Sequence, residues 1–172
     1  SVYATKIFRD EGENVEIGSH THTELAQLAQ NAGAVFSNNS WGGIGNGPYT
    51  AASAEFDALV RDSDPGELGN QQISYFFCAG NEGPDVGTTR AQASAKNVVS
   101  AGAHENSDAD GVDGSGFLPT HADNIRDISP GSSRGPTADG RLGVTVVATG
   151  THVQGAASTA DGYTGAHVSD KF

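Results

Sequence analysis

Short apolar runs alternate in this chain with segments of helical periodicity, and this alternation limits the fold more than any other feature. The apolar runs are rich in β-branched and aromatic residues, which favours β-strands. They cover residues 2–8, 34–37, 73–78 and 98–103. The segments 24–30 and 50–60 carry apolar residues three and four positions apart, as amphipathic helices do. Because β-α-β-α-β order requires right-handed crossovers, we predict an α/β protein with a parallel sheet and flanking helices.

The helix ends and the buried faces are predicted from the same segments. Thr21 or Thr23 can cap the first helix, and Gly33 ends it where glycine is usual. The predicted inward residues are Leu25, Leu28 and Ala29 in the first helix, and Ala51, Ala54, Phe56, Ala58 and Leu59 in the second. We expect the strand at 34–37 to be buried.

The length and composition of the chain exclude several classes of function. At 172 residues it fits one domain with a real core. The last third, from Glu105 onward, is loop-rich, with a β-hairpin predicted around residues 144–147. A net charge of -12 with only 9 basic residues argues against a nucleic-acid partner. No apolar run approaches the roughly 18 residues of a membrane span, so no membrane partner is expected. Cys78 is the single cysteine, and its apolar strand predicts an inert, buried thiol.

A glycine turn follows the strand predicted at 73–78 and places one carboxamide at its carboxyl end. The turn reads Ala79-Gly80-Asn81-Glu82-Gly83. Open α/β sheets bind ligands at this edge. The NH2 group of Asn81 can donate a hydrogen bond to an oxyanion that forms during acyl transfer. The alternative is an ordinary turn asparagine, because this residue tolerates left-handed backbone conformations.

Three motifs in this order resemble the subtilases, the subtilisin-like serine proteases. They are Ser40-Trp41-Gly42, the turn at 79–83, and Ser132-Ser133-Arg134-Gly135-Pro136-Thr137. The last motif is followed by the sequence 146–151, where Thr149 stands in the place of a proline that subtilases typically carry. The stretch 122–125 is similar to the larger extracellular branch of the family. The resemblance covers residues 1–151.

The resemblance implies a fold and an activity. The fold would be the subtilisin-like three-layer arrangement of a parallel sheet between helices. The activity would be hydrolysis of peptide bonds through an acyl-enzyme, with Asn81 as the oxyanion-hole donor that stabilises the tetrahedral intermediate. A secreted protein that acts on protein or peptide substrates is implied as well.

The same resemblance assigns substrate-binding residues around the two strand ends. The backbone of Ser40, Trp41 and Gly42 would pair with an extended peptide, as in strand addition. The Trp41 side chain itself is interpreted as a packing residue. Ala79 and Gly80 would form a wall of the first specificity pocket, and the alternative is that they only end the strand.

The catalytic Asp, His and Ser motifs of the subtilases do not occur in the family's pattern in this sequence. His20 and His22 are superficially similar to the His motif, but only a short helix separates them from Ser40, so we interpret them as loop or helix-start residues. Residues 163–167 are similar to the Ser motif with His167 in place of the nucleophile, which would give an inactive enzyme. We favour the other interpretation, in which the Ser motif lies beyond Phe172.

We therefore expect residues 1–172 to be a single partial catalytic domain, incomplete at both ends, between the family's His and Ser motifs. It would be part of a serine endopeptidase, with a peptide substrate and the remaining segments of the same domain as its partners. The alternative is a catalytically inactive subtilase-like module or fragment that at most binds extended peptides.

No cofactor is required by this chemistry, but one acidic loop raises the question of calcium. Asp108, Asp110 and Asp113 offer hard carboxylate oxygens at short intervals. The loop departs from the EF-hand pattern, because Val112 stands where a ligand belongs and no glutamate closes it. We favour a solvated acidic turn, with a calcium loop as the alternative.

Overall fold

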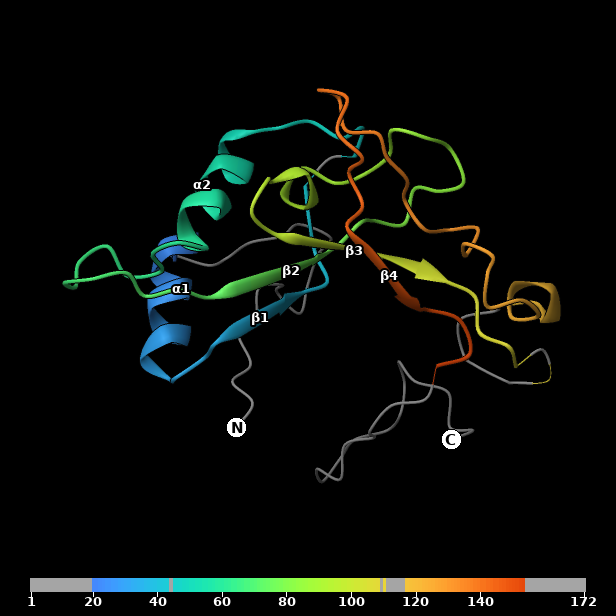
Figure 1. The fold of residues 1–172 in the computed structure, drawn as a ribbon, viewed down its shortest axis with the longest axis horizontal. Helices are drawn as coiled ribbons and strands as arrows, with labels where there is room; N and C mark the ends of the chain where they lie inside the picture. Colours follow the sequence, from blue (N-terminus) through green and yellow to red (C-terminus); the bar gives the residue numbers. More distant parts are fainter. Residues whose placement is uncertain (1–19, 44, 109, 111–116, 154–172) are drawn as a thin grey trace.

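The computed structural model describes residues 20–43, 45–108, 110 and 117–153. Its centre is a 4-stranded sheet in the order β1-β2-β3-β4, in which every neighbouring pair is parallel (Figure 1). The strands are β1 (Phe36–Asn39), β2 (Ser74–Cys78), β3 (Val99–His104) and β4 (Val146–Thr149). The helices are α1 (His22–Asn31) and α2 (Ala51–Leu59), with 3-10 turns η1 (Gln92–Ser94) and η2 (Pro119–His121). The predicted α/β class is confirmed, while the strand predicted at 2–8 lies outside the described residues.

Both α-helices begin with a reciprocal hydrogen-bonded cap. The Thr21 hydroxyl accepts from the Glu24 N–H at 3.1 Å, and the Glu24 carboxylate accepts from the Thr21 N–H at 2.6 Å. Thr50 and Ser53 form the same box at the start of α2. Gly33, with φ +80°, follows the end of α1, and its N–H donates to Gln30 at 2.8 Å. The sequence predicted both ends of α1, with Thr21 as one of two candidate caps, because capping depends on local residues alone; the cap at Thr50 was not predicted.

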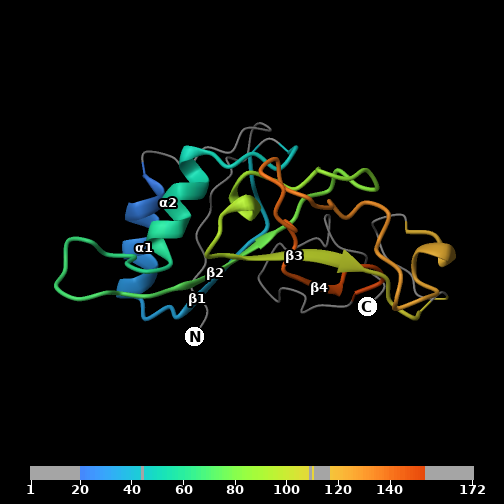
Figure 2. The same ribbon diagram turned by 45° about the horizontal axis from the view of Figure 1, so that its top comes forward.

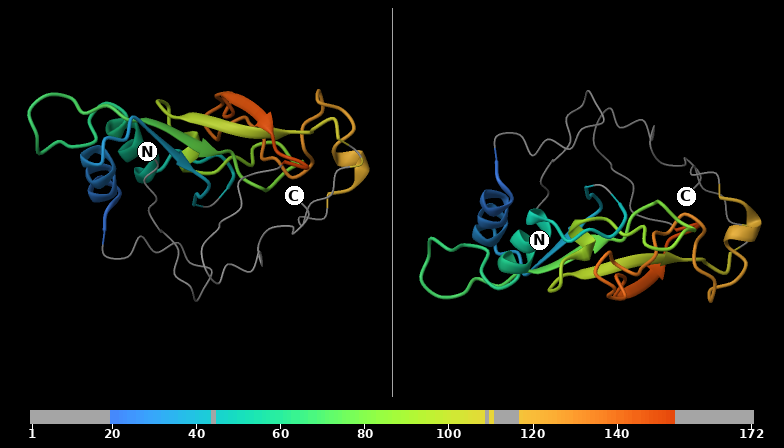
Figure 3. Two further views of the ribbon diagram at one scale, coloured as in Figure 1. Left: turned by 90° about the horizontal axis from the view of Figure 1, so that it is seen from below. Right: turned by 90° about the horizontal axis from the view of Figure 1, so that it is seen from above.

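Both helices lie on the same side of the sheet (Figures 2 and 3). The core between the helices and the sheet is built around Phe56 and Phe77, whose ring centroids are 4.7 Å apart. Its buried members are Ala26, Phe56, Leu59, Ile73, Tyr75, Phe77, Ala93, Ala95 and Val98. The second helical layer of the expected three-layer arrangement does not occur within the described ranges. No helix in those ranges has the length and apolar character that a membrane crossing needs.

The predicted inward face of α2 was partly wrong. Phe56 and Leu59 are buried as expected, but Ala51, Ala54 and Ala58 are exposed. The face is set by the two large side chains, so Ser53, three residues before Phe56, turns inward with them. Its hydroxyl donates to the Ala91 carbonyl at 2.6 Å, which satisfies the buried polar group.

The inward face of α1 is likewise rotated from the prediction. Leu28 is 42% exposed, whereas Ala26 is buried at 4%. Ala29 packs partly buried against the core, as predicted. Because His22, Ala26 and Ala29 stand at the spacing of one helical stripe, small residues bring α1 close to α2 and the larger Leu28 faces away.

The first described strand is exposed, which contradicts the buried strand predicted at 34–37. β1 begins two residues later, and Val35 and Phe36 are 72% and 63% exposed. Phe36 packs edge-on against Phe76 of β2, with ring centroids 6.3 Å apart. A shallow apolar hollow on this face is lined by Val35, Phe36, Asn38, Ser74 and Phe76. The Phe36 side chain therefore lies on the face of the sheet opposite to α1 and α2.

The β-hairpin predicted around residues 144–147 was also wrong. β4 runs parallel to β3, with Ala101 opposite Val146 and His104 opposite Thr149. The Thr145 N–H donates to the Ser100 carbonyl at 2.9 Å and leads the chain into this pairing. The long loop-rich excursion after β3 lets the chain return in the same direction, which a tight hairpin turn cannot do.

We predict that Phe77→Ala lowers the free energy of unfolding by about 3–5 kcal/mol, because it leaves a cavity among the packed aromatic rings. The matched variant is Phe36→Ala, whose side chain is 63% exposed, and its cost should be below about 1 kcal/mol. Urea unfolding followed by circular dichroism measures both. Equal losses for the two variants would contradict the placement of the core.

Candidate active site

Two of the sequence motifs lie side by side beyond the carboxyl end of β2. The loop that follows β2 is joined to residues 131–134 by backbone hydrogen bonds. The Gly83 N–H donates to Gly131 at 3.0 Å and the Ser133 N–H to Gly80 at 3.0 Å. The Thr88 N–H donates to Arg134 at 2.8 Å. Segments far apart in the sequence thus form one connected surface at the carboxyl edge of the sheet, the edge where open α/β sheets bind ligands.

Gly80 makes the sharp turn that separates β2 from Asn81. Its φ is +123°, and a Cβ atom there would lie 2.5 Å from Glu82 Oε2 and 2.6 Å from Ser133 Oγ. Both Ala79 and Gly80 are buried, and the Ala79 N–H donates to Ala101 at 2.8 Å. Only glycine fits both the backbone angle and the space.

The Glu82 carboxylate connects the loops around this turn. Its Oε2 accepts from the Asn81 N–H at 2.9 Å and from the Ser133 hydroxyl at 2.9 Å. Its Oε1 forms an ion pair with Arg90. The Arg90 guanidinium also donates to the Gly42 carbonyl at 2.9 Å. One carboxylate and one guanidinium therefore fix the loop after β1, the loop after β2 and the 131–134 segment relative to one another.

These positioning residues were not singled out by the sequence analysis. Glu82 and Ser133 stand within recognised motifs, so the signal was present for them. Arg90 stands outside these motifs and gave no such signal, because only the fold brings it beside Gly42 and Glu82.

Asn81 is exposed, and its backbone is held by Glu82. Among the described residues its carboxamide has no hydrogen-bond partner. The Nδ2 hydrogens are therefore available to a bound acceptor, while the main chain that carries them is fixed.

The segment after β1 divides into exposed and packed residues. Ser40 is exposed and continues β1, which is an edge strand of the sheet among the described residues. Gly42 is buried against Arg90, whose Cδ would lie 2.9 Å from an added Cβ. The Trp41 ring stacks on His22 at 5.5 Å and meets Phe77 edge-on at 5.5 Å. As predicted, the Trp41 side chain is a packing residue.

Within the described ranges, none of the histidines and acidic residues considered earlier forms a hydrogen bond or ion pair with the turn at 79–83. His22 Nδ1 is 2.7 Å from Glu55 of α2, and exposed His20 precedes α1, so the helix-start interpretation is confirmed. Asp108 and Asp110 are exposed. Asp113 and His167 lie outside the described residues.

We predict that Gly80→Ala lowers the free energy of unfolding by about 3 kcal/mol, because the methyl group overlaps two oxygen atoms in a strained backbone conformation. Gly140→Ala is the matched control, since Gly140 has φ +84° with no atom within 4 Å of an added Cβ. It should cost about 1 kcal/mol from the backbone alone. Chemical denaturation measures both, and similar losses would refute the close packing at Gly80.

We also predict slow reaction of Cys78 with Ellman's reagent in the native protein. Cys78 is half-buried and not fully buried as predicted. This burial is still the main cause that raises the pKa of the thiol, with Arg90 opposing the rise and Glu82 adding to it. At pH 8 the native protein should react more than about tenfold more slowly than the urea-unfolded chain, because little thiolate is present and access is restricted. Equal rates would show that the thiol is not protected.

Comparison with known proteins agrees with the arrangement of these motifs. No curated protein matches the chain significantly. The family model of the Subtilase family, Peptidase_S8, matches residues 1–171. Because this match spans nearly the whole sequence, the chain belongs to the subtilase family, the subtilisin-like serine proteases.

Proposed function

We propose that this chain provides the oxyanion donor and the peptide-binding edge of a subtilisin-like serine endopeptidase. The observation that carries the proposal is the Asn81 carboxamide, which is exposed and without a described protein partner while its backbone is fixed. Membership of the subtilase family supports the reaction class.

The proposed chemistry concerns charge on the scissile carbonyl. When a nucleophile attacks this carbon, the carbonyl oxygen becomes an oxyanion, and Asn81 Nδ2 donates a hydrogen bond to it. A donor that is already in place stabilises the transition state without reorganisation. The adjacent Glu82 carboxylate would repel the oxyanion, but its ion pair with Arg90 offsets this charge.

The proposed peptide-binding edge is the backbone of Ser40, Trp41 and Gly42. β1 is an edge strand within the described residues, so an extended peptide can add beside its continuation. Ala79 and Gly80 are assigned to the wall of the first specificity pocket.

The nucleophile and its base are not assigned to any described residue. The alternative function is a catalytically inactive subtilase-like module that binds extended peptides through the same loops. In either case we propose a secreted protein with protein or peptide ligands and no cofactor in the chemical step, which is supported by the family alone.

The expected effect of Asn81→Ala in the complete protein is a fall in kcat with little change in KM. The fall should be on the order of 10²–10³, the size known for the loss of such a donor from a subtilisin. The carboxamide stabilises charge that develops on the carbonyl oxygen only in the transition state, so substrate binding should not change. The matched control is Asn70→Ala, an exposed loop asparagine that should leave kcat unchanged.

Steady-state hydrolysis of a chromogenic peptide measures both variants. A raised KM with an unchanged kcat would refute the oxyanion role of Asn81. If the complete protein neither cleaves peptides nor takes up a fluorophosphonate, while it still binds extended peptides, the inactive module is the correct function.

A further inference from the structure

We propose that Arg90 restricts the first specificity pocket, which takes the side chain just before the scissile bond, to small uncharged residues. This role rests on the proposed function, which runs the peptide along residues 40–42 and gives the pocket a wall at Ala79 and Gly80. Arg90 lies between these two segments and belongs to none of the motifs identified in the sequence. It is therefore the residue of this chain that decides which substrate side chains fit.

The Arg90 side chain occupies the space between the two backbone segments. A Cβ atom added at Gly42 would lie 2.9 Å from Arg90 Cδ and 3.0 Å from Arg90 Cβ. A Cβ atom added at Gly80 would lie 3.0 Å from Arg90 Cγ. The aliphatic part of one side chain therefore packs against both glycines, which can approach it because they carry no side chain of their own. A substrate side chain that enters between Gly42 and Gly80 meets these methylene groups.

Arg90 is anchored at both ends, so its side chain does not leave this space freely. Its N–H donates to the Ala79 carbonyl at 2.9 Å, which fixes its main chain beside the pocket wall. Its guanidinium donates to the Gly42 carbonyl at 2.9 Å and forms the ion pair with Glu82. A large substrate side chain would have to break these charge-assisted bonds to make room, whereas a small one leaves them intact.

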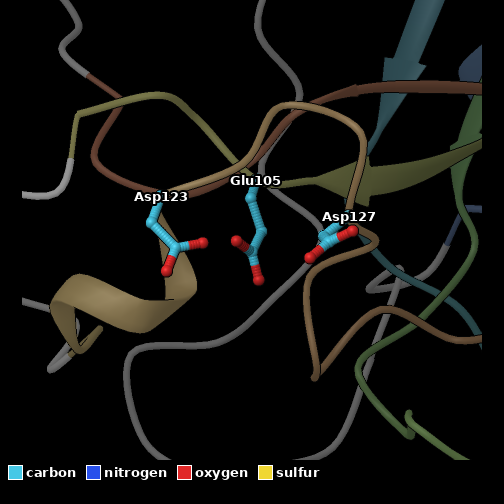
Figure 4. Close-up of side chains that lie close together, drawn as sticks. All are labelled: Glu105, Asp123 and Asp127. Carbon is cyan, nitrogen blue, oxygen red and sulfur yellow. The ribbon is translucent and has the colours of Figure 1, made fainter.

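The charges beside the pocket wall offset one another, which argues against a preference for acidic or basic residues. The Arg90 and Glu82 side chains are 28% and 39% exposed, and they form an ion pair. The carboxylates of Glu105, Asp123 and Asp127 lie together around the end of β3 and form no ion pair with Arg90 in the described part of the chain (Figure 4). One guanidinium thus faces one carboxylate, and no net charge remains to attract a charged substrate side chain.

The complete protein is assayed with peptides that differ only in the residue before the scissile bond, which is alanine, phenylalanine or lysine. In the parent, kcat/KM for the alanine peptide should exceed that for the phenylalanine peptide by about tenfold or more. This preference does not depend on any variant. A parent that cleaves after phenylalanine as fast as after alanine would therefore overturn the proposal, even if a variant fails to fold.

Arg90→Ala should change the preference of the pocket. It empties the space between Gly42 and Gly80, so the ratio of kcat/KM for phenylalanine to that for alanine should rise about 10–100-fold. The lysine peptide should gain as well, because Glu82 then lacks its counter-charge and can pair with the substrate ammonium group.

Two further variants separate the filling of the pocket from the fixing of the loops. Arg90→Met keeps a side chain of similar length and removes the ion pair, so it should lower kcat/KM for every peptide and retain the parent preference for alanine. Arg61→Ala is the matched control, an exposed arginine after α2 whose loss should change neither the rate nor the preference. Thermal unfolding of each variant shows whether it is folded.

Binding is measured separately, by fluorescence anisotropy with product-like peptides that end in alanine or phenylalanine, so the pocket is tested even without hydrolysis. If peptides are bound or cleaved and Arg90→Ala keeps the parent preference, the role of Arg90 is overturned while the proposed function stands. The same holds if Arg90→Ala and Arg90→Met shift the preference equally, because Arg90 then acts only by fixing the loops. A protein that neither cleaves nor binds any of the peptides overturns the proposed function and this role with it.

Discussion

The ion pair between Glu82 and Arg90 is the interaction on which the arrangement of the candidate site depends. Arg90 also binds the Gly42 carbonyl, and Glu82 also binds the Ser133 hydroxyl and the Asn81 N–H. The bonds to Gly42 and to Ser133 join loops that follow different strands, so the sheet alone would not fix the relative positions of these loops. Charge-assisted hydrogen bonds are well suited to this task, because they are strong and directional even when partly exposed.

The parts of the fold that depend on neighbouring residues could be predicted from the sequence. The caps at Thr21 and Thr50 are local, and so is the end of α1 at Gly33. The parallel sheet followed from the order of strands and helices. For the site, the position of Asn81 beyond β2 could be predicted because strand and turn are contiguous. Its role in catalysis remains a prediction.

The parts that depend on distant partners could not be predicted. Ser53 is buried because Ala91 offers an acceptor, which no local pattern shows. The apolar run before β1 indicated burial, but periodicity cannot tell which face of a sheet is covered. The contact of Arg90 with Gly42 could not be predicted either, because the two residues are distant in the sequence.

The pairing of the turn at Gly80 with Ser133 has a consequence for the order in which the protein matures. During synthesis the chain emerges from its amino end, so β1 and β2 leave the ribosome well before Ser133 does. The two strands can pair at that stage, but the carboxylate of Glu82 still lacks the hydroxyl that orients it. We therefore expect the nascent chain to pair β1, β2 and β3 first and to fix the turn at Asn81 only afterwards, so the scaffold folds before the candidate site is complete.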